Sequence, residues 1–69
     1  MTLKKHSVEL FGHKTSIALE DEFWQALQII AEQKKTTASA LIKKIDANRT
    51  GPLSSAVRVF ILTYFQGLI

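Results

Sequence analysis

Polar and apolar residues alternate near the start of the chain. In residues 14–19, every second position carries an apolar or β-branched side chain. The positions between them carry Lys14, Ser16 and Ala18. A period of two predicts a half-buried strand, with Ile17 and Leu19 facing a core and the other set facing outward.

The preceding residues show a related but shorter pattern. Val8 and Leu10 alternate with Ser7 and Glu9, and Gly12 follows. Glycine between two extended pieces is typical of a turn or a bulge. We predict one strand only, over residues 14–19.

After residue 20 the apolar spacing changes to three and four, which predicts three helices. Their expected bounds are about 21–34, 37–47 and 53–66. Carboxylates at the start of the first helix suit the positive end of the helix dipole. Thr36 or Thr37 is expected to cap the second helix. Gly51 and Pro52 separate the second helix from the third. The third helix is apolar on most of its circumference, so we expect it to be buried on more than one side.

Size and composition favour self-association. The chain has 69 residues and no cysteine, so disulfides cannot supplement a small core. A lone strand also needs partners for its backbone groups. We therefore expect one domain, residues 1–69, mainly α with one short strand, whose strand pairs with that of a second copy in an intermolecular antiparallel ribbon. The expected assembly is an intertwined homodimer, with a tetramer on DNA left open.

Charge is unevenly distributed along the chain. The net charge is +3, and residues 19–33 contain four acidic and no basic side chains, while basic residues predominate on both sides. A basic footprint favours a polyanionic partner such as nucleic acid.

The predicted ribbon and the second helix both offer contacts to double-stranded DNA. A two-stranded ribbon fits the major groove, where Lys14, Ser16 and Ala18 would face the base edges. A helix N-terminus binds phosphate through free N–H groups. At the second helix these residues are Thr37, Ala38 and Ser39.

The sequence as a whole resembles a known superfamily. The stretches at 12–24, 30–32, 36–42 and 53–60, including Phe23-Trp24 and Ser54-Ser55-Ala56, resemble ribbon-helix-helix proteins, and most closely a bacterial subgroup of short stand-alone proteins. The resemblance implies an intertwined dimer that binds DNA through Lys14, Ser16 and Ala18, with phosphate at residues 37–39. Ala18 departs from the pattern because it offers no hydrogen bond, and the third helix lies beyond the minimal fold.

Large apolar side chains are expected in the core or the dimer interface. These are Ile17, Leu19, Phe23, Trp24, Leu27, Leu41, Ile45 and Phe60. For Trp24, packing is favoured over a ligand-stacking role.

No residue pattern favours an enzyme. The serines lack a histidine or carboxylate at a convincing spacing, the glycines form no phosphate-binding loop, and no cofactor or metal site is expected. No long apolar run follows the basic start of the sequence, so we expect a cytoplasmic protein without a membrane span. The expected function is transcriptional regulation by sequence-specific DNA binding. The alternative is a protein-interaction or oligomerisation module, antitoxin-like or partner-recruiting, that uses the apolar C-terminal helix.

Overall fold

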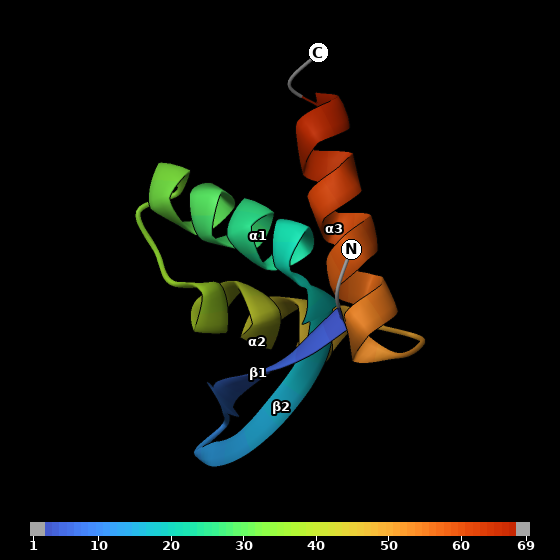
Figure 1. Ribbon diagram of the computed structural model, residues 1–69. Coiled ribbons are helices and arrows are strands. Elements are labelled where there is room, and N and C mark those ends of the chain that lie inside the picture. The colour runs from blue at the N-terminus through green and yellow to red at the C-terminus, as the bar shows by residue number, and fades with distance from the viewer. Residues whose placement is uncertain (1–2, 68–69) are drawn as a thin grey trace.

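A computed structural model describes residues 3–67 as a hairpin followed by three helices. Residues 1–2 and 68–69 of the expected domain lie outside the described residues. The elements are β1 (Leu3–Leu10), β2 (His13–Glu20), α1 (Asp21–Gln33), α2 (Ala38–Asn48) and α3 (Leu53–Gly67). The helices lie on one side of the hairpin, and α3 crosses beside α1 and β2 (Figure 1).

The hairpin is formed within the chain. β1 and β2 are antiparallel along their whole length, from Leu3 opposite Glu20 to Leu10 opposite His13. The two residues between the strands both have positive φ, 54° at Phe11 and 81° at Gly12. This is the pattern of a type I′ turn, whose twist matches the twist of paired strands.

The prediction of one lone strand was therefore wrong. β2 has β1 as its partner, so its backbone groups on that side are satisfied without a second copy. The physical reason is the short connection, because a two-residue turn brings residues 3–10 directly back onto β2. Among residues 3–67 the sheet has two strands, so the other edge of β2 carries no strand.

Local hydrogen bonds explain where α1 ends and α2 begins. The backbone N–H of Thr36 donates to Ala31 O at 2.9 Å and that of Lys35 to Glu32 O at 3.1 Å. With Lys35 at φ 56°, these bonds form a Schellman motif that closes α1. The Thr37 hydroxyl then accepts from the N–H of Ala40 at 3.1 Å, which makes Thr37 the N-cap of α2.

The hydrophobic core is formed within one chain. Its buried side chains come from all five elements: Val8, Leu10, Ile17, Leu19, Leu27, Ile30, Ala31, Ala38, Leu41, Ile42, Val57 and Ile61. Fully burying one aliphatic side chain of this size stabilises the fold by about 1.5–3 kcal/mol relative to leaving it exposed. α3 contributes Val57 and Ile61, so it is part of the domain's core.

The side chains expected in the core or the interface divide into two groups. Buried are Ile17, Leu19, Leu27 and Leu41. Packed against the core but only partly buried are Phe23, Trp24, Ile45 and Phe60. Trp24 stacks on the His6 ring, with 4.2 Å between centroids, and so fastens β1 to α1.

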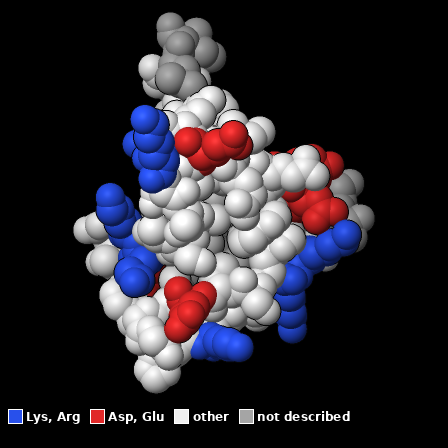
Figure 2. All heavy atoms as spheres, turned by 90° about the vertical axis from the view of Figure 1, so that its left-hand side faces the viewer, with Lys and Arg blue, Asp and Glu red and all other residues white. Residues whose placement is uncertain are grey.

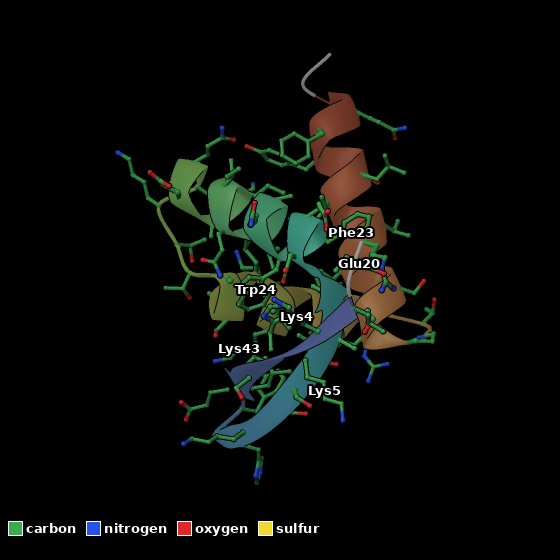
Figure 3. All side chains as sticks on the ribbon, viewed as in Figure 1. Lys4, Lys5, Glu20, Phe23, Trp24 and Lys43 are labelled. Carbon is green, nitrogen blue, oxygen red and sulfur yellow. The ribbon has the colours of Figure 1, made fainter. Side chains whose placement is uncertain are left out.

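An ion pair joins the end of β2 to α3. Arg58 approaches Glu20 Oε1 with Nη2 at 2.9 Å and Nε at 3.0 Å. A backbone hydrogen bond, followed by the hydrogen bond from Arg58, lowers the pKa of Glu20 below its ordinary 4.5. Figure 3 shows Glu20 beside α3, close to Phe23.

This ion pair predicts a pH dependence. Because the pKa of Glu20 is lowered by folding, its stabilising contribution is present above pH 4.5 and is lost as the pH falls through the folded value. Glu20→Gln should therefore reduce the difference in melting temperature between neutral and acidic buffer. Glu22→Gln, at an exposed position in the first turn of α1, is the matched control. An equal effect of both variants would argue against the pairing.

Candidate nucleic-acid interface

The hairpin turns one polar face away from the helices. Side chains directly opposite each other in an antiparallel pair lie on the same face. The register places Lys5 opposite Ala18, Ser7 opposite Ser16, and Glu9 opposite Lys14. These six residues form what we call the ribbon face: Lys5, Ser7, Glu9, Lys14, Ser16 and Ala18. All are exposed except Ala18, which is half-buried, and Figure 3 shows Lys5 pointing away from the helices.

The ribbon face carries both hydrogen-bond donors and acceptors. The ribbon face has two lysines and one glutamate, and Glu9 is directly opposite Lys14. Ion pairs among residues 3–67 join Lys4 to Asp21, Arg49 to Asp46 and Arg58 to Glu20, and none uses a lysine of the ribbon face. These lysine ammonium groups are therefore available to a polyanion.

The sequence pattern predicted only half of the ribbon face. Lys14, Ser16 and Ala18 are where the strand pattern puts them, on the side opposite the buried Ile17 and Leu19. The β1 residues Lys5, Ser7 and Glu9 were missed because residues 3–10 were not predicted as a strand. Their alternation with His6, Val8 and Leu10 was the available signal.

The three residues expected at a phosphate have different surroundings. The hydroxyl of Thr37 is engaged in capping, and Ala38 is only 7% exposed, with its side chain in the core. Ser39 is half-buried. The groups that suit a phosphate are therefore the backbone N–H groups of the first helical turn and the hydroxyl of Ser39.

The ribbon face and the start of α2 meet at a shallow hollow. Its volume is about 250 Å³, and it is lined by Ser7, Val8, Glu9, Lys14 and Ser39. The structure thus brings Lys14 and Ser39, from separate predicted elements, to one place. A ligand there would contact the ribbon and the helix N-terminus together.

Charge is mixed on one face of the molecule. On the face shown in Figure 2, basic and acidic side chains lie among one another and form no single patch. The distinctive feature of the ribbon face is therefore its geometry together with its lysines.

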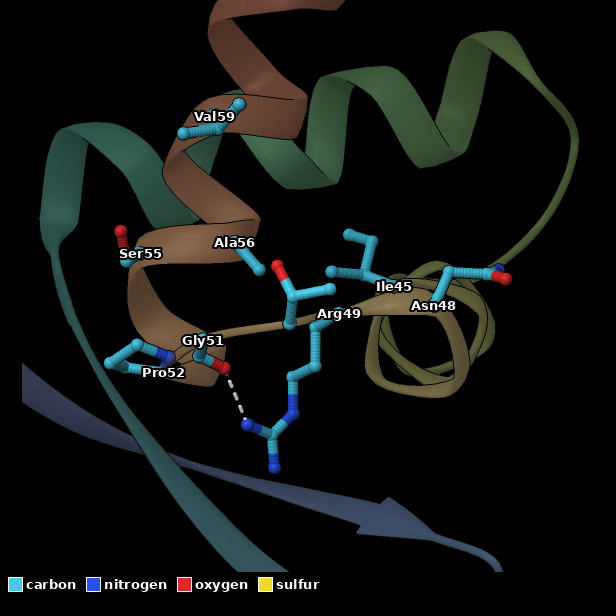
Figure 4. A pocket seen from close by; sticks show the side chains of 9 residues that line it. Ile45, Asn48, Arg49, Gly51, Pro52, Ser55, Ala56 and Val59 are labelled. Carbon is cyan, nitrogen blue, oxygen red and sulfur yellow. Dashed lines mark hydrogen bonds between the residues drawn. The ribbon is translucent and has the colours of Figure 1, made fainter.

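A second hollow lies between the end of α2 and the start of α3 (Figure 4). It measures about 400 Å³, and its lining includes Ile45, Asn48 and Val59. Arg49 donates to Asp46 Oδ1 and to the carbonyl oxygen of Gly51, each at 2.6 Å, so its guanidinium is already partnered. No group of three or more potential metal ligands gathers within the described part of the chain.

Comparison with family models decides the family. A model described as "Ribbon-helix-helix domain" matches residues 3–65. The chain belongs to the ribbon-helix-helix domain family. Ribbon-helix-helix proteins are generally DNA-binding transcription regulators or antitoxins. The match extends from the hairpin through most of α3, so the third helix is part of the ribbon-helix-helix match.

Two other comparisons gave no match, one with curated proteins and one with solved structures. Ribbon-helix-helix proteins typically dimerise and bind DNA. None of the helices within residues 3–67 combines the length and hydrophobicity that crossing a membrane requires.

Proposed function

We propose that this ribbon-helix-helix protein is a transcriptional regulator that reads the major groove of DNA with its ribbon face. The observation that carries the proposal is a two-stranded antiparallel ribbon whose outward side chains are polar, with Lys5 and Lys14 free of ion pairs among the described residues. The major groove is about 12 Å wide and admits a ribbon of this kind.

Each side chain of the ribbon face has a chemical counterpart in the groove. Lysine donates to the O6 and N7 acceptors of guanine, and a glutamate accepts from the amino group of cytosine. Ser7 and Ser16 can pair with several bases, and the methyl group of Ala18 suits the methyl group of thymine. The mixture of donors, acceptors and a methyl group supports sequence-dependent binding.

The start of α2 supplies the positioning contact. Ser39, in the first turn of α2, lines the hollow that Lys14 also lines, and the first N–H groups of a helix have no partner within it. A DNA phosphate there would fix the orientation of the ribbon in the groove without specifying a base.

We propose a homodimer as the DNA-binding form, with a tetramer on DNA as the larger assembly. The unpaired edge of β2 offers backbone groups to a second copy, and dimerisation doubles the basic surface. Such a regulator would act in the bacterial cytoplasm.

The alternative function, partner recruitment through α3, has less support. One side of α3 is already taken by Val57 and Ile61 in the core. Val59 and Leu62 are the large apolar side chains that α3 leaves exposed, at 59% and 57%. Two exposed side chains form a small surface, whereas the ribbon face spans the length of the hairpin.

The test is a binding titration with the whole protein. Duplexes selected from a random pool and unrelated duplexes are compared at low and moderate salt. We expect tighter binding to the selected sequence and a steep loss of affinity with salt, because lysines that contact phosphate release counterions. Equal, weak binding to both duplexes would contradict the proposed function.

A further inference from the structure

Phe11 occupies an unusual position at the tip of the hairpin. It is the first residue of the two-residue turn, with φ 54°, and 59% of it is exposed. This position of a type I′ turn favours asparagine, aspartate or glycine, and a bulky residue there is strained. The chain thus carries an aromatic ring where neither turn geometry nor core packing calls for one.

The ring lies beside one cationic side chain. Lys43 Nζ is 5.5 Å from the ring centroid, and His13 and Lys14 follow after Gly12 in the chain. All four residues are exposed, and Figure 3 shows Lys43 near the tip end of the hairpin. An apolar ring beside an ammonium group is suited to a partner that combines negative charge with apolar surface.

Duplex DNA has that combination at the edge of a groove. Phosphates line the edge, while deoxyribose and base edges lie just inside it. The tip adjoins Lys14, which lies on the ribbon face, so it would reach the groove edge when the ribbon lies in the groove. Strained backbone held at an exposed position is a frequent companion of binding sites.

We propose that Phe11 and Lys43 form a further DNA contact, in which Lys43 binds a phosphate and the Phe11 ring packs against the neighbouring sugar or base edge. This inference rests on the proposed function and extends it to two residues outside the ribbon face. Proteins use apolar side chains against DNA in this way, although mostly in the minor groove.

The test exploits the strain at residue 11. Phe11→Asn removes the ring and supplies a residue that the turn favours, so the melting temperature should be unchanged or raised. We expect the Kd for the selected duplex to rise roughly tenfold, equivalent to about 1.4 kcal/mol. Phe11→Tyr keeps the ring and should retain most of the affinity. Leu62→Gln, which removes another exposed apolar side chain far along the sequence, is the control and should bind as the wild type does.

Salt dependence separates the two residues. Lys43→Ala should reduce the slope of log Kd against log salt by the amount that corresponds to about one phosphate contact. Phe11→Asn should leave the slope unchanged. If Phe11→Asn lowers the slope as much as Lys43→Ala does, the ring only positions the lysine and the direct contact is refuted.

The remaining outcomes are also decisive. Wild-type affinity in Phe11→Asn, with weakened binding in Lys14→Ala, would overturn this inference and leave the proposed function standing. Equal weakening in Leu62→Gln would overturn it as well, because the effect would not be local to the tip. Absence of DNA binding by the wild type would overturn both proposals.

Discussion

Replacing Ile61 with alanine should lower the free energy of unfolding by about 2–5 kcal/mol, the usual cost of truncating a buried isoleucine. Ile61 is 4% exposed and, with Val57, joins α3 to the core formed by the hairpin, α1 and α2. Truncation would leave a cavity where the elements meet. Chemical denaturation of the purified variant measures the loss.

The neighbouring residue provides the control. Leu62 is in the same helix but is 57% exposed, so Leu62→Ala should change the stability by no more than about 0.5 kcal/mol. Similar, small effects of both substitutions would show that α3 is an appendage and not part of the folded core.

Reversing both ribbon-face lysines should have the largest effect on DNA binding. The double variant Lys5→Glu, Lys14→Glu loses two base contacts worth about 1–3 kcal/mol each and gains repulsion from the phosphates. Since 1.4 kcal/mol is tenfold in Kd, affinity for the selected duplex should fall at least roughly a hundredfold. Both side chains are exposed, so the melting temperature should change little.

A control variant must change the net charge equally elsewhere. Lys34→Glu combined with Gln28→Glu and Gln66→Glu does so at three exposed positions, which lie at the C-cap of α1, in α1 and in α3, respectively. Lys34 Nζ lies 5.6 Å from the Tyr64 ring, which places it beside α3. If the control loses as much affinity as the ribbon-face variant, binding depends on overall charge and the ribbon face has no special role.

The helices could be predicted from the sequence because each has a strong periodic signal and a clear boundary. Thr37 caps α2, and Gly51-Pro52 stand just before α3, as the pattern indicated. Burial within α3 was harder to predict, since its apolar residues surround most of the helix. Phe60 was expected in the core or the dimer interface, but it is only partly buried, while Val57 is fully buried.

The hairpin was the main omission. The turn signal was weak because Phe11-Gly12 has glycine at only one of the two positions where positive φ is needed. After Leu3 the first half of β1 is polar, and its buried side chains, Val8 and Leu10, come late in the strand. The pairing of the two strands also depends on register, which the alternation in each strand alone does not fix.

The buried position of Ala38 shows a second limit of prediction from the sequence. Sequence placed it at the start of a helix, where N–H groups are free, but the direction of its side chain depends on how α2 packs against the rest of the fold. The structure turns Ala38 into the core and leaves Ser39 toward the hollow beside Lys14.

The most direct measurement of the central claim is the sequence preference of Lys14→Ala. The preference is the ratio of the Kd for an unrelated duplex to the Kd for the selected duplex, measured at one salt concentration. If Lys14 contacts a base, the ratio should fall by roughly tenfold or more relative to the wild type, since a good base contact contributes about 1–3 kcal/mol of discrimination. Lys34→Ala removes the same charge away from the ribbon face and should leave the ratio unchanged. An unchanged ratio in a folded Lys14→Ala variant would contradict readout of DNA by the ribbon face.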